Sequence, residues 1–254
     1  MSNFNFINKT VIVTGGGTGI GYEIAKSFLN SGANVIITGR RKHILDKSIE
    51  EILLNNIKYK NKVFSIDLDL SNEDSVKELY NNVLQKYKRI DILINNSATW
   101  FLKPIKELLE EEIDYHFNNS FKTTVLCTKY ASTFMKKGGT IVNIGSFASV
   151  LPMKDASLYS AYKSAIGTFT KSSAAELGKE GIRVNCIIPG VIKTPMTSDF
   201  INNNFDKIIK PIALKRIGTT KEVANGVLFF SSDLSSYITG SILEITGGKY
   251  LTQL

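Results

Sequence analysis

A tyrosine and a lysine four residues apart are the side chains of this sequence best suited to proton transfer. Tyr159 and Lys163 lie in the run YSAYK, and residues at i and i+4 of a helix share one face. A free phenol has a pKa of about 10, and a neighbouring ammonium favours the phenolate and lowers that pKa. The spacing therefore predicts that Tyr159 is a general acid–base catalyst tuned by Lys163. Tyr162, which is adjacent to Lys163 and points elsewhere, is the weaker candidate.

A serine upstream completes an acid–base set. Ser146 precedes Tyr159 by thirteen positions and follows the apolar run Ile141–Ile144, which is expected to be a strand. The carboxyl ends of strands in an open parallel sheet converge on the ligand crevice, so the Ser146 hydroxyl is placed to hydrogen-bond the reacting oxygen of a substrate. A tyrosine and a lysine at this spacing also occur by chance as a surface pair. Their order after Ser146 and after a glycine-rich loop favours catalysis.

The glycine-rich loop reads TGGGTGIG over Thr14–Gly21, between an expected strand at Val11–Val13 and an expected helix at Gly19–Asn30. Glycines let a backbone turn tightly and approach a pyrophosphate closely, and a helix N-terminus offers unpaired N–H groups to phosphate oxygens. The loop therefore predicts a dinucleotide site. The strict GxGxxG spacing is absent, so the loop taken alone is also compatible with a structural turn.

The end of the second expected strand bears on which dinucleotide is bound. Enzymes for the unphosphorylated cofactor usually carry an acidic residue there, which accepts a hydrogen bond from the ribose 2′-OH. Here the strand ends in Gly39, Arg40 and Arg41. A guanidinium matches a phosphate bidentately, so the two arginines favour NADP(H) over NAD(H), which stays possible. The alternative is a solvated basic turn at the start of a helix.

Short apolar runs alternate with amphipathic stretches along the whole chain. The expected strands are Val11–Val13, Val35–Ile37, Val63–Ile66, Ile92–Ile94, Ile141–Ile144, Val184–Ile188 and Ile242–Ile245. The expected helices are Gly19–Asn30, one opened by a capping pattern at Ser71–Asp74, one from about Ile105 to Met135, Ser157–Leu177, and one opened by Thr219–Glu222. Strands that are apolar on both faces and alternate with helices indicate a parallel sheet covered on both sides.

We therefore predict an α/β protein with a single-domain Rossmann fold over residues 1–254, built on a doubly wound, parallel seven-stranded sheet. No linker is long enough to divide the chain. The segment Thr194–Pro211 is the one irregular stretch, and residues 194–211 are a candidate substrate lid.

Composition narrows the class of protein. The 254 residues are 43% hydrophobic and 21% charged, as in soluble globular proteins, and no apolar run is long enough for a transmembrane helix. The net charge of +8 is spread along the chain, so we expect no nucleic-acid partner and no membrane partner. Cys127 and Cys186 lie far apart without a metal-binding cluster. We expect them to be reduced thiols of a cytoplasmic protein without a metal, and the N-terminal MSNFNF shows no secretory pattern.

These features resemble the short-chain dehydrogenase/reductase family, in particular a 3-oxoacyl-reductase-like subgroup, and the likeness covers nearly the whole chain. The family's TGxxxGxG corresponds to Thr14–Gly21, and its Ser–Tyr–Lys set falls on Ser146, Tyr159 and Lys163. The resemblance implies hydride exchange between NADP(H) and a carbonyl or secondary alcohol. A neighbouring possibility is reduction of a C=C bond in an enoyl or dienoyl thioester, and another is a cofactor-binding sensor without catalysis. The family commonly forms tetramers or dimers through its long middle helices, so a homotetramer or homodimer is implied.

Further family motifs extend the implied cofactor site. The family's Asn-Asn-Ala-Gly appears as Asn95–Ala98, and its Pro-Gly-x-x-x-Thr segment as Pro189–Thr194. The aspartate that binds near the adenine matches Asp69, with Asp67 as a competing match. The cofactor contacts implied by the resemblance are Gly15, Thr18, Gly19, Ile20, Arg40, Arg41, Asp69, Leu70, Asn96, Ser97, Ala98, Tyr159, Lys163, Pro189, Gly190, Ile192 and Thr194. Asn95 is implied to help hold the sheet.

The family's fourth catalytic residue is an asparagine on the long middle helix, which holds a water for proton relay. A gapless match places Ser120 at this position, and Asn119 lies one residue earlier. Ser120 is therefore the candidate fourth residue. The alternatives are a local shift that presents Asn119, or an altered relay.

Apolar side chains suggest the wall of a substrate pocket. They follow the fourth strand, follow the fifth strand, or lie in the irregular segment. They are Trp100, Phe101, Phe147, Leu151, Met153, Met196 and Phe200. The same residues are also compatible with an ordinary core. Fatty acyl thioesters, steroids, sugars and polyketide-like ketones all remain open as substrates.

Overall fold

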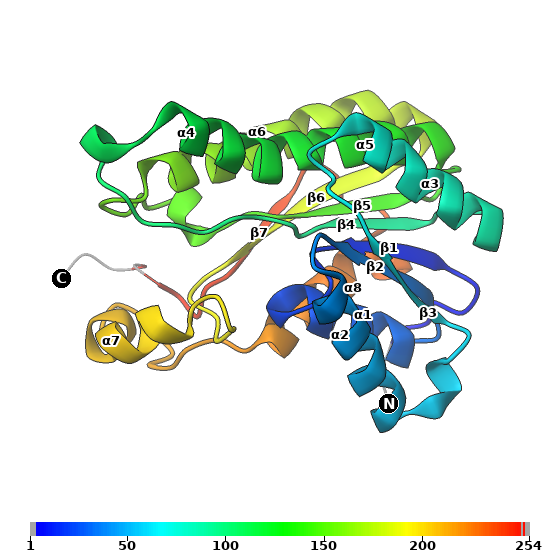
Figure 1. Ribbon diagram of the computed structural model, residues 1–254, viewed down its shortest axis with the longest axis horizontal. Helices are drawn as coiled ribbons and strands as arrows, with labels where there is room; N and C mark the ends of the chain where they lie inside the picture. Colours follow the sequence, from blue (N-terminus) through cyan, green and yellow to red (C-terminus); the bar gives the residue numbers. More distant parts are fainter. Residues whose placement is uncertain (1–3, 250, 252–254) are drawn as a thin grey trace.

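Within residues 4–249 and 251, which the computed structural model describes, seven parallel strands form one sheet (Figure 1). The first three residues of the N-terminal segment considered above lie outside the described residues. The strand order is β3-β2-β1-β4-β5-β6-β7, and each neighbouring pair is parallel. The strands are β1 (Thr10–Thr14), β2 (Asn34–Gly39), β3 (Val63–Asp67), β4 (Ile92–Asn95), β5 (Thr140–Ile144), β6 (Arg183–Pro189) and β7 (Ile242–Ile245). The predicted fold class is confirmed.

The central strands are apolar on both faces. In β1, Val11 and Val13 join the hydrophobic core on one side of the sheet and Ile12 joins the core on the other side. All three side chains are fully buried, as expected where successive side chains of a strand point to opposite faces. A sheet with two apolar faces is stable only when helices cover both of them, which is the arrangement observed.

The helices form one layer on each side of the sheet (Figure 1). Helices α1, α2 and α8 cover one face and α3, α5 and α6 the other. Helices α4 and α7 lie at the same end of the molecule, on opposite sides of the sheet. The helices are α1 (Gly19–Asn30), α2 (Lys42–Asn55), α3 (Glu73–Tyr87), α4 (Glu110–Phe117), α5 (Thr123–Phe134), α6 (Ser157–Leu177), α7 (Ser198–Ile209) and α8 (Thr220–Ser231).

The long middle helix differs from the prediction. The expected helix from about Ile105 to Met135 is divided into a 3₁₀ turn at Ile105–Glu107, helix α4, a π-helical turn at Asn118–Lys122, and helix α5. In the π turn the Thr123 N–H donates to the carbonyl of Asn118, five residues back. Each π turn adds one residue to the helical repeat, so side chains before it and after it follow different registers.

Two further expectations are corrected and two are confirmed. The segment Thr194–Pro211 is not irregular throughout, because it contains α7, which is kinked at Asn204. Helix α3 is capped by Asn72, whose side chain accepts from the Asp74 N–H, rather than by the full box expected from Ser71. The box of Thr219 and Glu222 forms at α8, and the helix Ser157–Leu177 has the expected bounds.

Over the described part of the chain, no helix combines the length and apolarity needed to cross a bilayer. The same residues contain no group of three or more histidine, cysteine, aspartate or glutamate side chains placed to hold a metal ion. Cys127 and Cys186 are free and buried, as predicted, and burial raises the pKa of the Cys127 thiol to about 12.

Candidate active site

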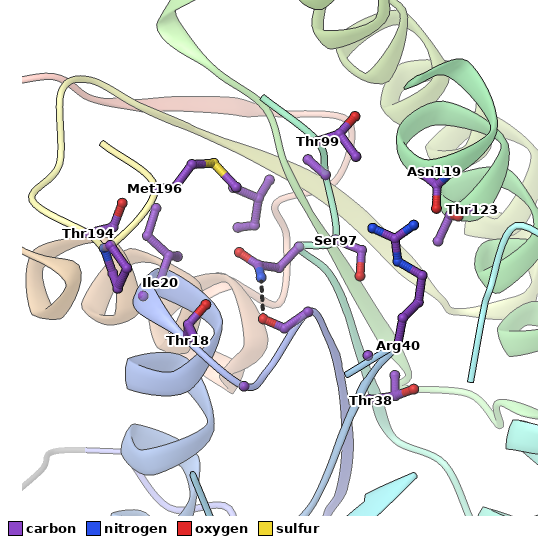
Figure 2. Close-up of a pocket in the computed structure, with 18 of the residues that line it drawn as sticks. Thr18, Ile20, Thr38, Arg40, Ser97, Thr99, Asn119, Thr123, Thr194 and Met196 are labelled. Atoms are coloured by element: carbon purple, nitrogen blue, oxygen red, sulfur yellow. Dashed lines mark hydrogen bonds between the residues drawn. The ribbon is translucent and has the colours of Figure 1, made fainter. Parts of the chain in front are cut away.

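A cleft of about 290 Å³ opens at the carboxyl ends of the strands, where β1, β2, β4, β5 and β6 lead into their loops. All seventeen residues implied to contact a dinucleotide line this cleft, and Ser146 lines it with them. They come from seven separate stretches of the chain. Figure 2 shows the glycine loop, with Thr18 and Ile20, facing Thr194 and Met196, while Arg40 reaches toward Asn119 and Thr123. The fold therefore gathers the predicted site into one cavity.

The glycine loop is shaped by backbone geometry that side chains would disturb. Gly15 and Gly19 have φ of +63° and +56°, in the left-handed region that favours glycine. A Cβ at Gly21 would lie 2.3 Å from the carbonyl oxygen of Gly15. The Asn96 amide donates to the carbonyls of Thr14 and Gly15, at 3.0 and 3.1 Å. The loop is thus fixed between β4 and the N-terminus of α1, with room for a ligand against its backbone.

The neighbouring Asn95 has a purely structural set of contacts. It is 3% exposed, and its amide donates to Asn143 Oδ1 at 2.8 Å and to Thr128 Oγ1 at 3.1 Å. These bonds join β4 to β5 and to α5. The arrangement is the sheet-holding one that the family resemblance implied.

The end of β2 presents two exposed arginines to the cleft. The Arg40 guanidinium donates to the hydroxyl of Tyr115, on α4, at 2.9 Å and lies 5.4 Å from the centre of its ring. The buried Thr38 hydroxyl has no hydrogen-bond partner although Thr38 borders the cleft. A Cβ at Gly39 would meet only a leucine methyl at 3.8 Å. This end of the cleft therefore offers positive charge, an unsatisfied hydroxyl and free space.

Of the two aspartates that matched the adenine position, Asp69 lines the cleft and Asp67 is absent from its wall. The Asp69 carboxylate accepts from the Ser71 N–H at 3.0 Å, which fixes the turn after β3. The structure thus brings Asp69 rather than Asp67 to the site.

Ser146, Tyr159 and Lys163 meet at the centre of the cleft wall. Ser146 follows β5, whereas Tyr159 and Lys163 share one face of α6. The Ser146 side chain lies beside the Tyr159 phenol. The Lys163 ammonium lies 5.9 Å from the centre of the Tyr159 ring and donates to the Ile144 carbonyl at 2.8 Å. The structure therefore brings the three side chains predicted to be catalytic together at the cleft wall.

The pKa of Tyr159 moves in the direction opposite to the prediction. Burial raises it, and the hydrogen bond from Ser146 opposes this rise only in part. Lys163 does not produce the expected lowering, because its ammonium is bonded to the backbone and is itself destabilised by burial, which lowers the pKa of Lys163 to about 8. Burial outweighs the charge effect because a phenolate loses its hydration there. Tyr159 is consequently a protonated phenol at neutral pH.

The π turn decides which side chain of the middle helix reaches the cleft. Asn119 lines the cleft, and its amide donates to the Tyr115 carbonyl at 2.8 Å. Ser120 is fully buried, does not line the cleft, and accepts from the Thr99 N–H at 3.2 Å. The structure thus brings Asn119 rather than Ser120 to the cleft wall, as expected where a π turn adds one residue to the helical repeat.

The apolar residues expected to form a pocket wall divide into two groups. Phe147 is 9% exposed and packs in a small core with Ile166 and Cys186. Trp100 instead lies against the Tyr159 ring, with centroids 4.6 Å apart. Met196 lines the cleft and is 57% exposed. Of the predicted set, Met196 before α7 lines the cleft, and Trp100 packs beside the Tyr159 ring.

Comparisons with known proteins identify the family. The family model described as enoyl-(acyl carrier protein) reductase matches residues 15–249. The chain is 35% identical to the 3-oxoacyl-[acyl-carrier-protein] reductase FabG of Chlamydia trachomatis serovar D, over 95% of this chain and 97% of the relative. It is 34% identical to a 3alpha-hydroxysteroid dehydrogenase of Mediterraneibacter gnavus, over 94% and 96% of the two chains. A short chain dehydrogenase from Burkholderia cenocepacia J2315, solved in complex with NADP, superposes with a TM-score of 0.86 at 28% identity, over 96% of this chain and 98% of that one. The chain belongs to the short-chain dehydrogenase/reductase family.

This short-chain dehydrogenase/reductase is an oxidoreductase. A second solved relative, described as a short-chain dehydrogenase/reductase of the glucose/ribitol dehydrogenase type from Brucella melitensis, has a TM-score of 0.91 at 28% identity and covers 96% of this chain and 98% of its own. The relatives differ in the substrates that their names state, an acyl thioester, a steroid and a sugar or polyol. Family membership therefore leaves the substrate of this enzyme to be argued from its own site.

Proposed function

We propose that this enzyme interconverts a carbonyl and a secondary alcohol with NADP(H), using Tyr159 as the general acid–base. The single observation that carries the proposal is the meeting of Ser146, Tyr159 and Lys163 at the wall of the cleft. A hydroxyl beside a phenol, with an ammonium one helical turn away, is a set able to exchange a proton with an oxygen and to stabilise charge on it.

The cleft has the features that NADP(H) requires. The glycine loop presents bare backbone at the N-terminus of α1, where phosphates are favoured. Arg40 and Arg41, beside the unpartnered Thr38 hydroxyl and the space at Gly39, suit a 2′-phosphate. By family resemblance, the adenine lies near Asp69 and Leu70 and the nicotinamide near Pro189, Gly190, Ile192 and Thr194. The remaining proposed contacts are Ser97, Ala98 and Tyr159. Lys163 is proposed to contact the ribose that carries the nicotinamide. The cofactor supplies the hydride when bound.

In the reductive direction, Tyr159 gives its proton to the oxygen that gains negative charge. The Ser146 hydroxyl donates a hydrogen bond to the same oxygen, and the Lys163 ammonium places a positive charge 5.9 Å from the centre of the Tyr159 ring. Because burial raises the pKa of Tyr159, the phenol is in the donating form at neutral pH. Reduction should therefore slow as the pH rises toward that pKa, whereas alcohol oxidation, which needs the phenolate, should accelerate.

We assign the proton relay beyond Lys163 to the π turn at Asn119. Of the three alternatives left open by the sequence, this one is supported by the place of Asn119 in the cleft wall and by the burial of Ser120. The amide of Asn119 is held by the Tyr115 carbonyl, so its position is fixed by the helix.

The decisive experiment replaces Tyr159 by phenylalanine, which keeps the ring and removes only the hydroxyl. The Tyr159→Phe variant should bind NADPH within about twofold of the wild type, measured by nucleotide fluorescence titration, because the ring packing is unchanged. Its carbonyl reduction, followed at the nicotinamide absorbance with a panel of ketones and aldehydes, should fall by about 10³-fold. Tyr237→Phe, a substitution at a fully exposed tyrosine, is the matched control. Substantial turnover by the Tyr159 variant would contradict the assignment.

One observation favours a second candidate, reduction of a C=C bond in an enoyl thioester. The matching family model bears the description of an enoyl reductase. The Ser146 hydroxyl beside Tyr159 suits a C=O substrate better, because both groups can interact with an oxygen that gains negative charge. Comparing crotonyl-CoA with acetoacetyl-CoA in the same assay separates the two reactions.

We also propose that the enzyme assembles as a homotetramer or homodimer through its middle helices. Ile113 and Phe117 on α4 and Phe134 on α5 are 40%, 44% and 36% exposed, which leaves apolar surface on these helices to be covered by another subunit. Light scattering after gel filtration measures the subunit number. Residues 194–211, which include α7, are proposed as the substrate lid because Met196 borders the cleft.

A further inference from the structure

Trp100 is the sole tryptophan of the chain, and it lies directly against the proposed catalytic tyrosine. The Trp100 and Tyr159 rings are 4.6 Å apart between centroids and perpendicular at 88°. On another side, Trp100 meets Phe200 of α7 at 6.2 Å and 70°. The indole therefore lies between the Tyr159 ring and α7 of the proposed lid.

The residue before Trp100 is bound by three helical elements at once. The Thr99 N–H donates to Ser120 Oγ at 3.2 Å, and the Thr99 hydroxyl lies 3.1 Å from the same oxygen. The Thr99 hydroxyl is also 2.6 Å from His116 Nδ1, and the Thr99 carbonyl accepts from the Tyr162 hydroxyl. We call Thr99, His116, Ser120 and Tyr162 the Thr99 cluster. It ties the loop after β4 to α4, to the π turn and to α6.

The residue after Trp100 is held by the same cluster. The Phe101 ring stacks on the His116 ring with centroids 3.6 Å apart and planes 3° apart. Ser120, Tyr162 and His116 are 0%, 3% and 9% exposed, so their hydrogen bonds are shielded from competing water. Both neighbours of Trp100 are thus fixed, and the indole has little freedom to move away from Tyr159.

We propose that Trp100 is a substrate-contacting residue that selects carbonyl compounds with an apolar ring next to the carbonyl, and that the Thr99 cluster positions it. The inference rests on the proposed function and names its substrate class. Aromatic faces gain contact with CH groups of a flat ring. A sugar or other hydroxylated ketone would bury hydroxyls against Trp100 and Phe200 without hydrogen-bond partners, which is unfavourable.

Binding is tested first, in a protein that needs no turnover. Because Trp100 is the sole tryptophan, intrinsic fluorescence reports this site alone. The Tyr159→Phe variant is titrated with 2-decalone and, separately, with dihydroxyacetone, with and without NADP⁺. We expect a saturable change in emission with 2-decalone and none with dihydroxyacetone. Absence of a saturable change with 2-decalone, or an equal response to the hydroxylated ketone, would overturn the proposal.

Failure of the proposed function gives a different result. If wild-type enzyme turns over no carbonyl compound but the fluorescence titration saturates with 2-decalone, the oxidoreductase assignment is contradicted and the apolar subsite stands. If the wild-type enzyme turns over a carbonyl compound but 2-decalone does not change the emission, the oxidoreductase assignment stands and the apolar subsite is contradicted.

Kinetics then test Trp100 itself. Trp100→Ala should raise the KM for 2-decalone at least tenfold while the dissociation constant for NADPH stays within twofold, and Trp100→Phe should restore most of the loss. Tyr237→Ala, at a fully exposed aromatic position, is the matched control and should leave both constants unchanged. An unchanged KM in Trp100→Ala would remove this residue from the substrate site.

The positioning role is tested with a matched pair at Thr99. Thr99→Val keeps the shape and loses the hydroxyl, whereas Thr99→Ser keeps the hydroxyl. We expect Thr99→Val to shift the fluorescence emission of Trp100 and to lower its anisotropy. The KM for 2-decalone should rise by a factor about five times larger than the factor by which kcat changes. Thr99→Ser should resemble the wild type. Wild-type emission and KM in Thr99→Val, or equal defects in both variants, would overturn the positioning role.

Discussion

The nucleotide end of the cleft is formed mainly by backbone at the tips of β1 and β2, whereas the substrate end is formed by side chains from several loops and helices. At the first end, Gly15 and Gly19 leave the main chain bare, and Asn96 holds it through two carbonyls. At the second end, Trp100, Phe200 and Met196 come from stretches with no fixed strand geometry. Changes at the nucleotide end should therefore affect every substrate alike, whereas changes at the substrate end should discriminate among substrates.

The largest effect is expected from a side chain placed in the glycine loop. A Cβ at Gly21 would lie 2.3 Å from the Gly15 carbonyl oxygen, so Gly21→Val must displace the loop. We expect NADPH affinity to fall by at least about 10²-fold, since bound phosphates depend on the helix N-terminus, with the same loss of kcat/KM for every carbonyl substrate. Gly178→Ala, where a Cβ would meet nothing within 4 Å, is the control. Substrate-dependent losses would break the distinction between the two ends.

The next effect concerns Lys163, where the two ends meet. Burial lowers its pKa to about 8 from 10.5, so between these values the unfolded chain binds more protons than the folded chain and stability rises with pH. Below pH 8 the buried ammonium costs about 3 kcal/mol. The wild type should therefore gain stability between pH 7 and pH 10, whereas Lys163→Met lacks this gain. The free energy of unfolding of Lys163→Met minus that of the wild type should decrease by up to about 3 kcal/mol over this range. Urea denaturation at both pH values measures it, and a constant difference would argue against a buried charge.

The relay assignment is tested by neighbouring substitutions on the π turn. Asn119→Ala should lower kcat about 30-fold with little change in NADPH affinity, because a positioned proton-transfer group contributes on this scale. Ser120→Ala should lower kcat less and should change the KM for 2-decalone instead, because Ser120 contacts Thr99 rather than the cleft. Reduction of 2-decalone by NADPH, followed by stopped flow over a range of 2-decalone concentrations, gives kcat and KM separately for each variant. The opposite pattern would return the relay to Ser120.

The smallest effect is expected at Arg40. Arg40→Ala removes one of two guanidinium groups and also frees Tyr115. We expect the KM for NADPH to rise about tenfold while the KM for NADH is unchanged, because only NADPH carries the 2′-phosphate. Tyr115→Phe removes the hydroxyl bonded to Arg40. The KM for NADPH should be unchanged or lower in this variant. Equal losses with both nucleotides would assign Arg40 a structural role.

The nucleotide end was predictable from sequence because its determinants are local. Gly15 to Gly21 must make the turn between β1 and α1 wherever that turn lies in a sheet, and Arg40 directly follows β2. The strand ends then bring Asp69, Asn96 and Ser146 to the same edge without further information. Each of these residues lines the cleft as predicted.

The substrate end was less predictable because its determinants are not local. The placement of Ser120 assumed one continuous α-helical repeat, and the π turn broke that repeat by one residue. The pKa of Tyr159 depends on burial beneath Trp100 and other side chains, which spacing along α6 cannot reveal. Contacts among residues 100, 159 and 200 join three distant parts of the chain, and no periodic pattern encodes them.

The pairing of β1 joins strands that are made at different times during synthesis. Val11 pairs with Val35 on one side and with Ile92 on the other, so the middle of the sheet stays incomplete until β4 has emerged from the ribosome. From β5 onward each strand pairs with the strand made just before it. These later strands therefore extend the sheet at one edge, in the order in which they are made. The glycine loop, Arg40 and Asp69, which line the nucleotide end of the cleft, are accordingly made before Tyr159.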